Sequence, residues 1–334
     1  MGERIAVLGA GSWGTALAHH LSRAGHDVKL WARDEEVIKH IKEQGSNPRY
    51  LKTHKLSPTI VPTANLSDLK GLEIFVFAVP STAFREVATE VRPFVPRNSL
   101  LISTAKGLEE QSLKPMSEVL HEVMGAIPHV AVLSGPSFAK EVVEGKPTAV
   151  TMAGFKEEIA AEAAKLFHFD NFRVYTSTDL IGVEFGGVLK NVIALACGVV
   201  DGVDMGANAR AALITRGLTE MQRLVIALGG EPMTVAGLSG LGDLLLTATG
   251  DLSRNRQVGL RLGKGEKLDS ILSSLGEVAE GVKSTHKVIE LANRVRITLP
   301  ITEQVDKLLR GESTPQQAVM ALLARSAGSE IKAN

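Results

Sequence analysis

Short apolar runs alternate with amphipathic stretches through the first half of the chain. The runs are four to seven residues long and rich in Val, Ile, Leu and Phe, as expected of buried strands. They cover residues 4–9, 27–32, 73–79, 100–103, 130–134 and 148–152. Since helical patterns separate them, the first half is predicted to be an α/β fold with a largely parallel sheet and crossover helices.

The pattern changes after Tyr175. Five long apolar-periodic stretches follow, without strand-like runs between them, at residues 179–200, 210–228, 283–294, 301–309 and 314–325. Asp179 is a plausible N-cap for the first of these helices, which would be the hinge between two halves. We therefore predict a Rossmann-type, doubly wound NAD(P)-binding domain over residues 1–178 and an all-helical substrate-binding and catalytic domain over residues 179–334.

Composition narrows the possible classes of protein. A chain of 334 residues with 44% apolar content is large enough for two buried cores. Its 37 basic and 37 acidic residues cancel, which argues against nucleic acid or anionic lipid as a main partner. The single cysteine, Cys197, and the lack of a signal-type N-terminus favour a reducing cytoplasm. The richest apolar run, residues 192–200, is too short to span a membrane, and we expect no metal.

A glycine fingerprint follows the first predicted strand. Gly9, Gly11 and Gly14 form G-x-G-x-x-G at the start of a helix, the context in which the pattern indicates a dinucleotide site. The glycines would permit a tight turn, close approach of the pyrophosphate and close helix packing, while the amides of Ser12 and Trp13 face the pyrophosphate. The alternative is a strand-to-helix turn without a ligand. The phosphate-binding loop motif of nucleoside triphosphatases is absent from the sequence.

Cofactor preference depends on the end of the second strand, where an NAD site usually places a carboxylate on the ribose. This chain has Arg33 followed by Asp34. Arg33 could pair with a 2′-phosphate, which favours NADP over NAD. Alternatively it is a solvated residue that pairs with Glu36, or it stacks on adenine.

The helix predicted from Asp179 carries two different faces. Apolar residues at 181, 185, 188, 192, 195 and 199 form one stripe that would face a core. A second face collects Gly186, Gly187, Lys190, Asn191, Ala194 and Gly198. Mid-helix glycines destabilise a helix by about 1 kcal/mol each, so a cofactor or another backbone is expected to approach this face, with ordinary helix packing as the alternative. Partial burial would lower the pKa of Lys190 toward the range useful for proton transfer.

Five separate blocks resemble one known family. They are residues 103–109 (STAKGLE), 134–141 (SGPSFAKE), 189–192 (LKNV), 208–216 (NARAALITR) and 253–255 (SRN). In this order they are similar to the NAD(P)-dependent sn-glycerol-3-phosphate dehydrogenases of the bacterial type. The resemblance implies reduction of dihydroxyacetone phosphate to sn-glycerol 3-phosphate for phospholipid synthesis, by a homodimer that uses NADPH or NADH.

The resemblance also assigns roles to residues. Lys190 would be the proton donor and acceptor, with Lys106 polarising the carbonyl and Asp243 orienting the amine. Lys106 follows the strand 100–103 at the sheet edge where such folds bind ligands, although a solvated loop lysine is the alternative. Substrate contacts would come from Lys106, Gly135, Ser137, Lys190, Asp243, Thr247, Ser253, Arg254 and Asn255, with Arg254 on the phosphate. Cofactor contacts would include Lys106, Ala139, Arg254, Val278 and Glu280. Val188 departs from the small residue that the family pattern leads us to expect after Gly187.

Two other functions remain open from sequence. A 3-hydroxyacid dehydrogenase of the 6-phosphogluconate type would place asparagine four residues after the helix lysine, where this chain has Ala194. A non-catalytic NAD(P)-sensing regulator would be expected to lack one of Lys106, Lys190 and Arg254, yet the chain has all three.

Overall fold

The computed structural model describes residues 2–125, 129–275 and 279–325 and divides into two compact units. The first unit contains residues 1–188 and 225–244, and the second contains residues 189–224 and 245–334. This division lies inside three helices, α7 (Leu180–Gly202), α8 (Gly206–Ala227) and α10 (Asp243–Thr249), each of which contributes to both units. The boundary expected after residue 178 marks a different feature, the point where strands give way to helices.

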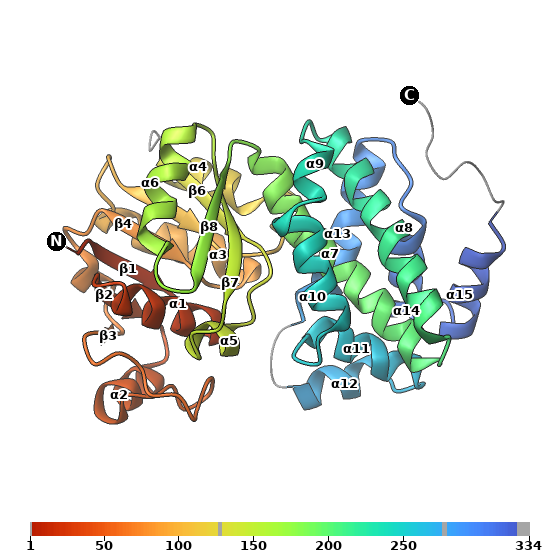
Figure 1. Ribbon diagram of the computed structural model, residues 1–334, viewed down its shortest axis with the longest axis horizontal. Coiled ribbons are helices and arrows are strands. Elements are labelled where there is room, and N and C mark those ends of the chain that lie inside the picture. Colours follow the sequence, from red (N-terminus) through yellow and green to blue (C-terminus); the bar gives the residue numbers. More distant parts are fainter. Residues whose placement is uncertain (1, 126–128, 276–278, 326–334) are drawn as a thin grey trace. The chain divides into compact units, whose positions relative to one another are not determined.

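An eight-stranded sheet forms the centre of the first unit (Figure 1). Its spatial order is β3-β2-β1-β4-β5-β6-β7-β8, and every pairing is parallel except that of β6 with β7. The strands are β1 (Arg4–Leu8), β2 (Asp27–Trp31), β3 (Val61–Thr63), β4 (Ile74–Phe77), β5 (Leu100–Ser103), β6 (His129–Ser134), β7 (Thr148–Gly154) and β8 (Phe172–Ser177). The predicted Rossmann-type sheet is confirmed, and six of its strands were predicted within a few residues.

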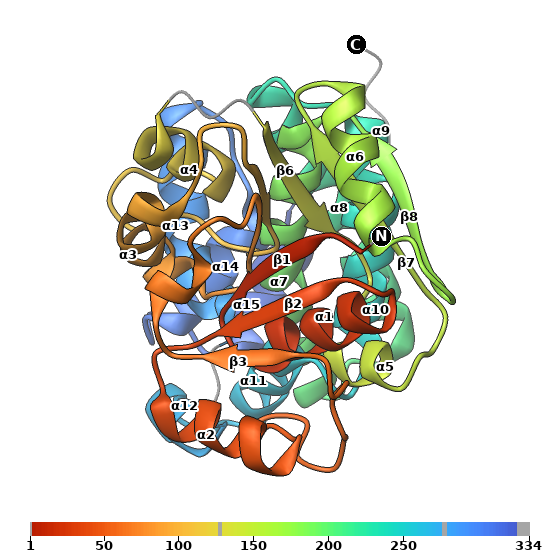
Figure 2. The same cartoon turned by 90° about the vertical axis from the view of Figure 1, so that its left-hand side faces the viewer.

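The sheet is covered on both faces because its strands are apolar on both faces. In β1, Ile5 and Val7 join one core cluster, while Ala6 and Leu8 join the other. Figure 2 shows α3 (Ser81–Val91) and α4 (Met116–Met124) on one side of the sheet, with α1 (Ser12–Arg23) and α6 (Glu157–Phe167) on the other. Parallel strands with crossover helices require this double covering.

Shorter helices complete the first unit. They are α2 (Glu35–Gln44), η1 (Leu66–Leu69), η2 (Arg92–Phe94), α5 (Ala139–Val143), α9 (Pro232–Val235) and the π-helical turn η3 (Leu238–Gly242). The chain runs outward from β1 to β3 and then returns to β4, so the sheet has its topological switch point between β1 and β4. Ligands bind at such switch points, beyond the carboxyl ends of the strands.

The described residues of the second unit are helical or irregular, which confirms the predicted helical half. Besides parts of α7 and α8, the unit contains α10 (Asp243–Thr249), α11 (Arg254–Gly263), α12 (Leu268–Leu275), α13 (Glu280–Arg294), α14 (Pro300–Leu309) and α15 (Pro315–Leu323), with the first residues of α10 assigned to the first unit. The Asp179 carboxylate accepts a hydrogen bond from Gly182 N at 2.8 Å, so the predicted N-cap of α7 is confirmed.

Helix α7 is buried from Gly182 to Val200, so the apolar stripe predicted to face a core is buried apart from the half-buried Ile181, and the second face is buried as well. It is long and apolar enough to cross a membrane by length and composition, but its apolar window lies entirely inside the structure, as in a core helix. Its small residues allow close helix packing. A Cβ added at Gly198 would lie 2.2 Å from Arg256 O in α11, and one added at Gly259 would lie 2.0 Å from Leu195 O. Backbone approach therefore explains Gly198.

Candidate functional site

The glycine-rich turn follows β1 at the switch point of the sheet. Gly9 has φ +112°, and a Cβ there would lie 2.8 Å from Ala78 O, beyond the end of β4. A Cβ at Gly14 would lie 1.9 Å from Gly9 O, whereas one at Gly11 would meet no atom of the described residues within 4 Å. The turn thus requires glycine at positions 9 and 14, while Gly11 leaves the surface of the turn uncovered by a side chain.

The N-terminus of α1 is suited to binding an anion. Its N-cap, Gly11, has no side chain to cap the helix, and the first turn contains no acidic residue. The helix dipole and the first-turn amides, including those of Ser12 and Trp13, are therefore not countered by a carboxylate of that turn. These residues fit the pyrophosphate of a dinucleotide.

One residue that the sequence interpretation missed holds this turn. Asn47 is fully buried, and its Nδ2 donates to Ala10 O at 2.9 Å and to Thr15 Oγ1 at 2.8 Å. Its Oδ1 accepts from the amides of Arg49 and Tyr50, both at 3.1 Å. A polar residue at a fully buried position is the signal that would have identified it, but burial is not visible in a loop sequence.

Arg33 lies after β2, as predicted, but it pairs with carboxylates of α3. Its guanidinium contacts Glu86 and Glu90, each at 3.0 Å, and these contacts raise its pKa further. The pairing with Glu36 considered from sequence is therefore wrong. The neighbouring Asp34 caps α2 through the amides of Glu36 and Val37 and also pairs with Arg49.

Lys106 lies in the loop after β5, as predicted, and it is held by two residues of the predicted site. Its Nζ donates to Gly135 O at 3.0 Å and forms an ion pair with Asp243 at 2.5 Å. Asp243 is 2% exposed, so this carboxylate is almost fully desolvated. Removing one partner of such a pair leaves a buried charge without compensation. The first unit thus brings together Lys106, Gly135 and Asp243.

The loop after β6 shapes the surroundings of Lys106. Gly135 has φ +140°, and a Cβ there would lie 2.9 Å from Val150 Cα, so only glycine fits. Ser137 Oγ donates to Gly135 O at 2.9 Å, and Ala139 is the first residue of α5. A Cβ on Gly187 of α7 would lie 2.8 Å from Ser134 Oγ and 3.3 Å from Lys106 Cγ. The bare Gly187 therefore leaves room for the Lys106 side chain.

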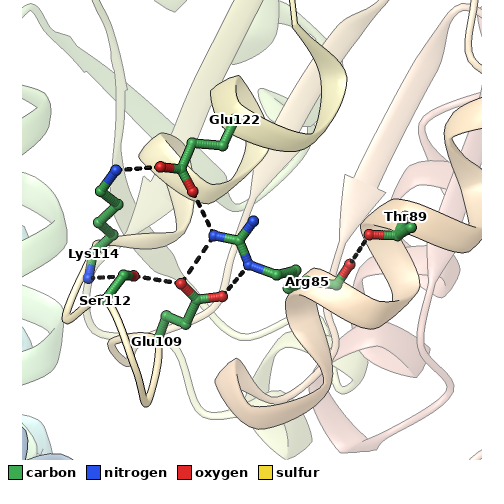
Figure 3. A network of polar contacts seen from close by, with 6 residues as sticks. All are labelled: Arg85, Thr89, Glu109, Ser112, Lys114 and Glu122. Atoms are coloured by element: carbon green, nitrogen blue, oxygen red, sulfur yellow. Dashed lines mark hydrogen bonds and ion pairs between the residues drawn. The ribbon is translucent and has the colours of Figure 1, made fainter.

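A polar network fixes the base of the Lys106 loop (Figure 3). The Glu109 carboxylate accepts from Arg85 of α3 through both of its oxygens and from Ser112. Arg85 also contacts Glu122 of α4, which in turn contacts Lys114. The Arg85 fork lowers the pKa of Glu109. Because Glu109 is three residues after Lys106, these contacts restrict the loop that carries the lysine.

Lys190 is buried in the second unit, as its helical position suggested. It is 7% exposed, and its Nζ donates to Thr247 Oγ1 at 2.7 Å. Thr247 is itself 3% exposed. Since Asp243 and Thr247 are four residues apart on α10, they lie on the same face of that helix.

The predicted phosphate-binding segment begins α11. Ser253 is its N-cap and accepts from Arg256 N at 3.2 Å, but the hydroxyl retains its own proton as a donor. Arg254 is exposed at the first position of this helix. Asn255 is buried, and its amide donates to Asn191 Oδ1 and accepts from Gly281 N, both at 2.8 Å. Asn255 therefore joins α11 to α7 and α13. Glu280 begins α13, and Val278 lies outside the described residues.

Two buried carboxylates outside the predicted site cap helices from a distance. Glu184 of α7 accepts from Ser117 N at 3.0 Å near the start of α4. Glu220 of α8 accepts from Ile301 N at 2.6 Å and Thr302 N at 3.2 Å at the start of α14. Burial raises the pKa of each to about 7. Both residues fix helix positions rather than line the predicted site.

Comparison with known protein families decides the assignment. The family model of the NAD-dependent glycerol-3-phosphate dehydrogenase N-terminus matches residues 4–160, and that of the C-terminus matches residues 179–320. The chain belongs to the NAD-dependent glycerol-3-phosphate dehydrogenase family. The resemblance read from five sequence blocks is thereby confirmed. Members of this family use NAD or NADP.

Individual members of the glycerol-3-phosphate dehydrogenase family are similar over the whole length. The chain is 48% identical to glycerol-3-phosphate dehydrogenase (NAD(P)+) of Moorella thermoacetica, with 99% of each chain covered. It is 47% identical to the Nitratidesulfovibrio vulgaris protein of the same name, covering 98% of this chain and all of the relative. The crystal structure of glycerol-3-phosphate dehydrogenase from Coxiella burnetii superposes with a TM-score of 0.93 at 42% identity, covering 97% of this chain and 99% of that structure.

Proposed function

We propose that this chain interconverts dihydroxyacetone phosphate and sn-glycerol 3-phosphate by hydride transfer with NAD(P)H. The main observation behind the proposal is that Lys190 is buried and that its Nζ donates to Thr247 Oγ1, in a chain that belongs to this family. When bound, NAD(P)H would supply the hydride for the central carbon of the ketone. A proton must then reach the former carbonyl oxygen, and a buried lysine is suited to deliver it.

The remaining residues bind and orient the substrate. Lys106, held by Gly135 O and Asp243, polarises the carbonyl with its positive charge and contacts the cofactor. Arg254 provides a planar pair of donors for the phosphate, assisted by Ser253 and Asn255. Gly135, Ser137 and Thr247 complete the substrate contacts. Because the charges of Lys106 and Asp243 are already fixed in place, little reorganisation is needed when substrate binds.

The two halves of the sequence have different roles in the reaction. Residues 1–178 bind the dinucleotide through the glycine-rich turn, and residues 179–334 supply the proton donor and the phosphate contacts. Ala139, Val278 and Glu280 add cofactor contacts. The enzyme works in the cytoplasm as a homodimer and supplies glycerol 3-phosphate for phospholipid synthesis.

NADPH is the preferred cofactor in this proposal. Arg33 follows β2, where the ribose of a bound dinucleotide is expected, and a guanidinium there pairs with a 2′-phosphate. The contacts of Arg33 with Glu86 and Glu90 are exposed and therefore weak, so a 2′-phosphate can replace these carboxylates as the partner of the guanidinium.

A substrate panel tests this function against its nearest alternative. Purified protein is mixed with NADPH and dihydroxyacetone phosphate, and the product is identified by chiral analysis as sn-glycerol 3-phosphate. Unphosphorylated dihydroxyacetone should react much more slowly, because the Arg254 contact is lost. Turnover of 6-phosphogluconate or a 3-hydroxyacid with NADP⁺, without reduction of dihydroxyacetone phosphate, would favour the hydroxyacid dehydrogenase instead.

A further inference from the structure

Asn47 uses its whole side-chain amide inside the first unit. It lies in the loop after α2 and is 0% exposed. The amide donates twice, to Ala10 O and Thr15 Oγ1, and accepts twice, from the amides of Arg49 and Tyr50. An asparagine amide has two donor hydrogens and one oxygen with two lone pairs, so all four positions are used. The partners also fix the orientation of the amide. If it were flipped, its NH₂ group would face the backbone N–H groups of Arg49 and Tyr50, which are donors as well.

The two donated bonds flank the part of the turn that would face a pyrophosphate. Ala10 lies between Gly9 and Gly11, and Thr15 is in the first turn of α1. The amides of Ser12 and Trp13 lie between these two anchor points in the chain. Their orientation decides how well they stabilise an anion, and fixing it before binding removes an ordering cost.

The two accepted bonds connect the turn with the other end of the dinucleotide site. They hold the backbone of Arg49 and Tyr50, and the Arg49 guanidinium pairs with Asp34 after β2. The end of β2 is where the ribose of a bound dinucleotide is expected. One buried amide thus links the pyrophosphate-binding turn to the segment beside the ribose position.

We propose that Asn47 is a positioning residue that preorganises the glycine-rich turn for the cofactor. The proposal rests on the cofactor-binding part of the proposed function. Because Asn47 acts on the turn that meets the pyrophosphate, which NAD and NADP share, it affects affinity for both cofactors equally. A residue that only stabilises the fold would change the melting temperature without changing the affinity of the folded protein.

The test is Asn47→Asp, which keeps the shape and the accepting oxygen but replaces the group that donates to Ala10 O and Thr15 Oγ1. Dissociation constants for NADP⁺ and NAD⁺ are measured by quenching of tryptophan fluorescence, since Trp13 lies in the turn itself. We expect both affinities to fall by about tenfold, as for loss of a buried hydrogen bond, with their ratio unchanged. Affinity should partly recover at lower pH, because a protonated carboxyl group can again donate to Ala10 O.

Asn171→Asp is the matched control. Asn171 also donates to a backbone carbonyl of the first unit, Gly145 O at 3.1 Å, and the substitution changes the charge in the same way. It should bind both cofactors as the wild type does. If Asn47→Asp also binds like the wild type, the proposal is wrong, whereas a wild type that binds neither cofactor would contradict the proposed function itself.

A milder variant covers the case in which Asn47→Asp does not fold. Thr15→Val removes one of the two acceptors and retains the bond to Ala10 O. It should weaken both cofactors by a smaller factor than Asn47→Asp. Unchanged affinity in Thr15→Val, together with an unfolded Asn47→Asp, would assign Asn47 to stability alone.

Discussion

Lys106 and Asp243, which are 137 residues apart in sequence, form an ion pair of 2.5 Å in the first unit. Lys106 comes from the loop after β5, and Asp243 is the first residue of α10 after the π-helical turn η3. The carboxylate is 2% exposed and the lysine side chain 19% exposed, so bulk water screens the pair weakly. We therefore expect the two side chains to act together.

Asp243→Asn should lower kcat/KM for dihydroxyacetone phosphate by about tenfold to a hundredfold, because Lys106 loses the charge that orients it. Lys106→Met should lower kcat/KM by at least the same factor. The decisive measurement is a double-mutant cycle on kcat/KM. If the residues act as a unit, the double variant will lose little more than the worse single variant. Additive losses would mean that the two residues act separately.

Arg254→Ala should raise KM for dihydroxyacetone phosphate by about tenfold or more with a smaller change in kcat, because the contact with phosphate exists in both the ground and the transition state. Arg261→Ala is the matched control, since Arg261 lies on the same helix and pairs with the exposed Glu266. Its KM should stay at the wild-type value. Equal KM values for both variants would remove Arg254 from the phosphate site.

Arg33→Ala should reduce the ratio of kcat/KM for NADPH to that for NADH by about tenfold, because only NADPH carries the 2′-phosphate. Glu86→Gln combined with Glu90→Gln should change the ratio in the opposite direction, since these carboxylates compete for the guanidinium. Steady-state rates with each cofactor give both ratios. A ratio that is the same in all three proteins would show that another residue selects the cofactor.

Glu220 should make the protein less stable as the pH rises through neutrality. Its pKa is about 7 in the folded chain and 4.5 as an ordinary glutamate, so the folded state binds more protons between these values. Its contribution is fully present below the lower value and is lost as the pH rises through the upper one. The pKa of Glu184 is also raised to about 7, so its contribution to stability changes with pH in the same direction.

Glu220→Gln isolates this contribution. Desolvation lowers the pKa values of His19, His20 and His121, which therefore act with the opposite sign, but these histidines are common to both proteins. The melting temperature of the variant minus that of the wild type should therefore increase from about pH 5 to about pH 8. A difference that does not change with pH would show that Glu220 titrates normally in the fold.

The sequence predicted the elements whose patterns are local. Six strands, the glycine-rich turn and the Asp179 cap follow from runs, spacings and cap chemistry that lie within a few residues. Two strands were not predicted. β3 has three residues, and β8 is largely exposed with polar residues at alternating positions, so neither has the apolar run of a buried strand.

The tertiary relationships in the site could not be predicted from local patterns. The partners of Arg33 on α3, the pairing of Lys106 with Asp243 and the four bonds of Asn47 all join segments distant in sequence. The small face of α7 was correctly identified as crowded, but periodicity could not show that α11 packs against Gly198. The helix face suggested that Lys190 is partly buried, but the roles of Lys106, Lys190 and Asp243 were assigned through family resemblance, because no local pattern indicates which residue a lysine pairs with.

The most direct measurement is the rate at which dihydroxyacetone phosphate oxidises NADPH and NADH in the presence of the wild type and of Lys190→Met, followed at the nicotinamide absorbance band. The account predicts turnover by the wild type with either cofactor, a loss of about a hundredfold or more in kcat for Lys190→Met, and unchanged cofactor affinity in that variant. Absence of turnover by the wild type with both cofactors, or near-normal turnover by Lys190→Met, would contradict it.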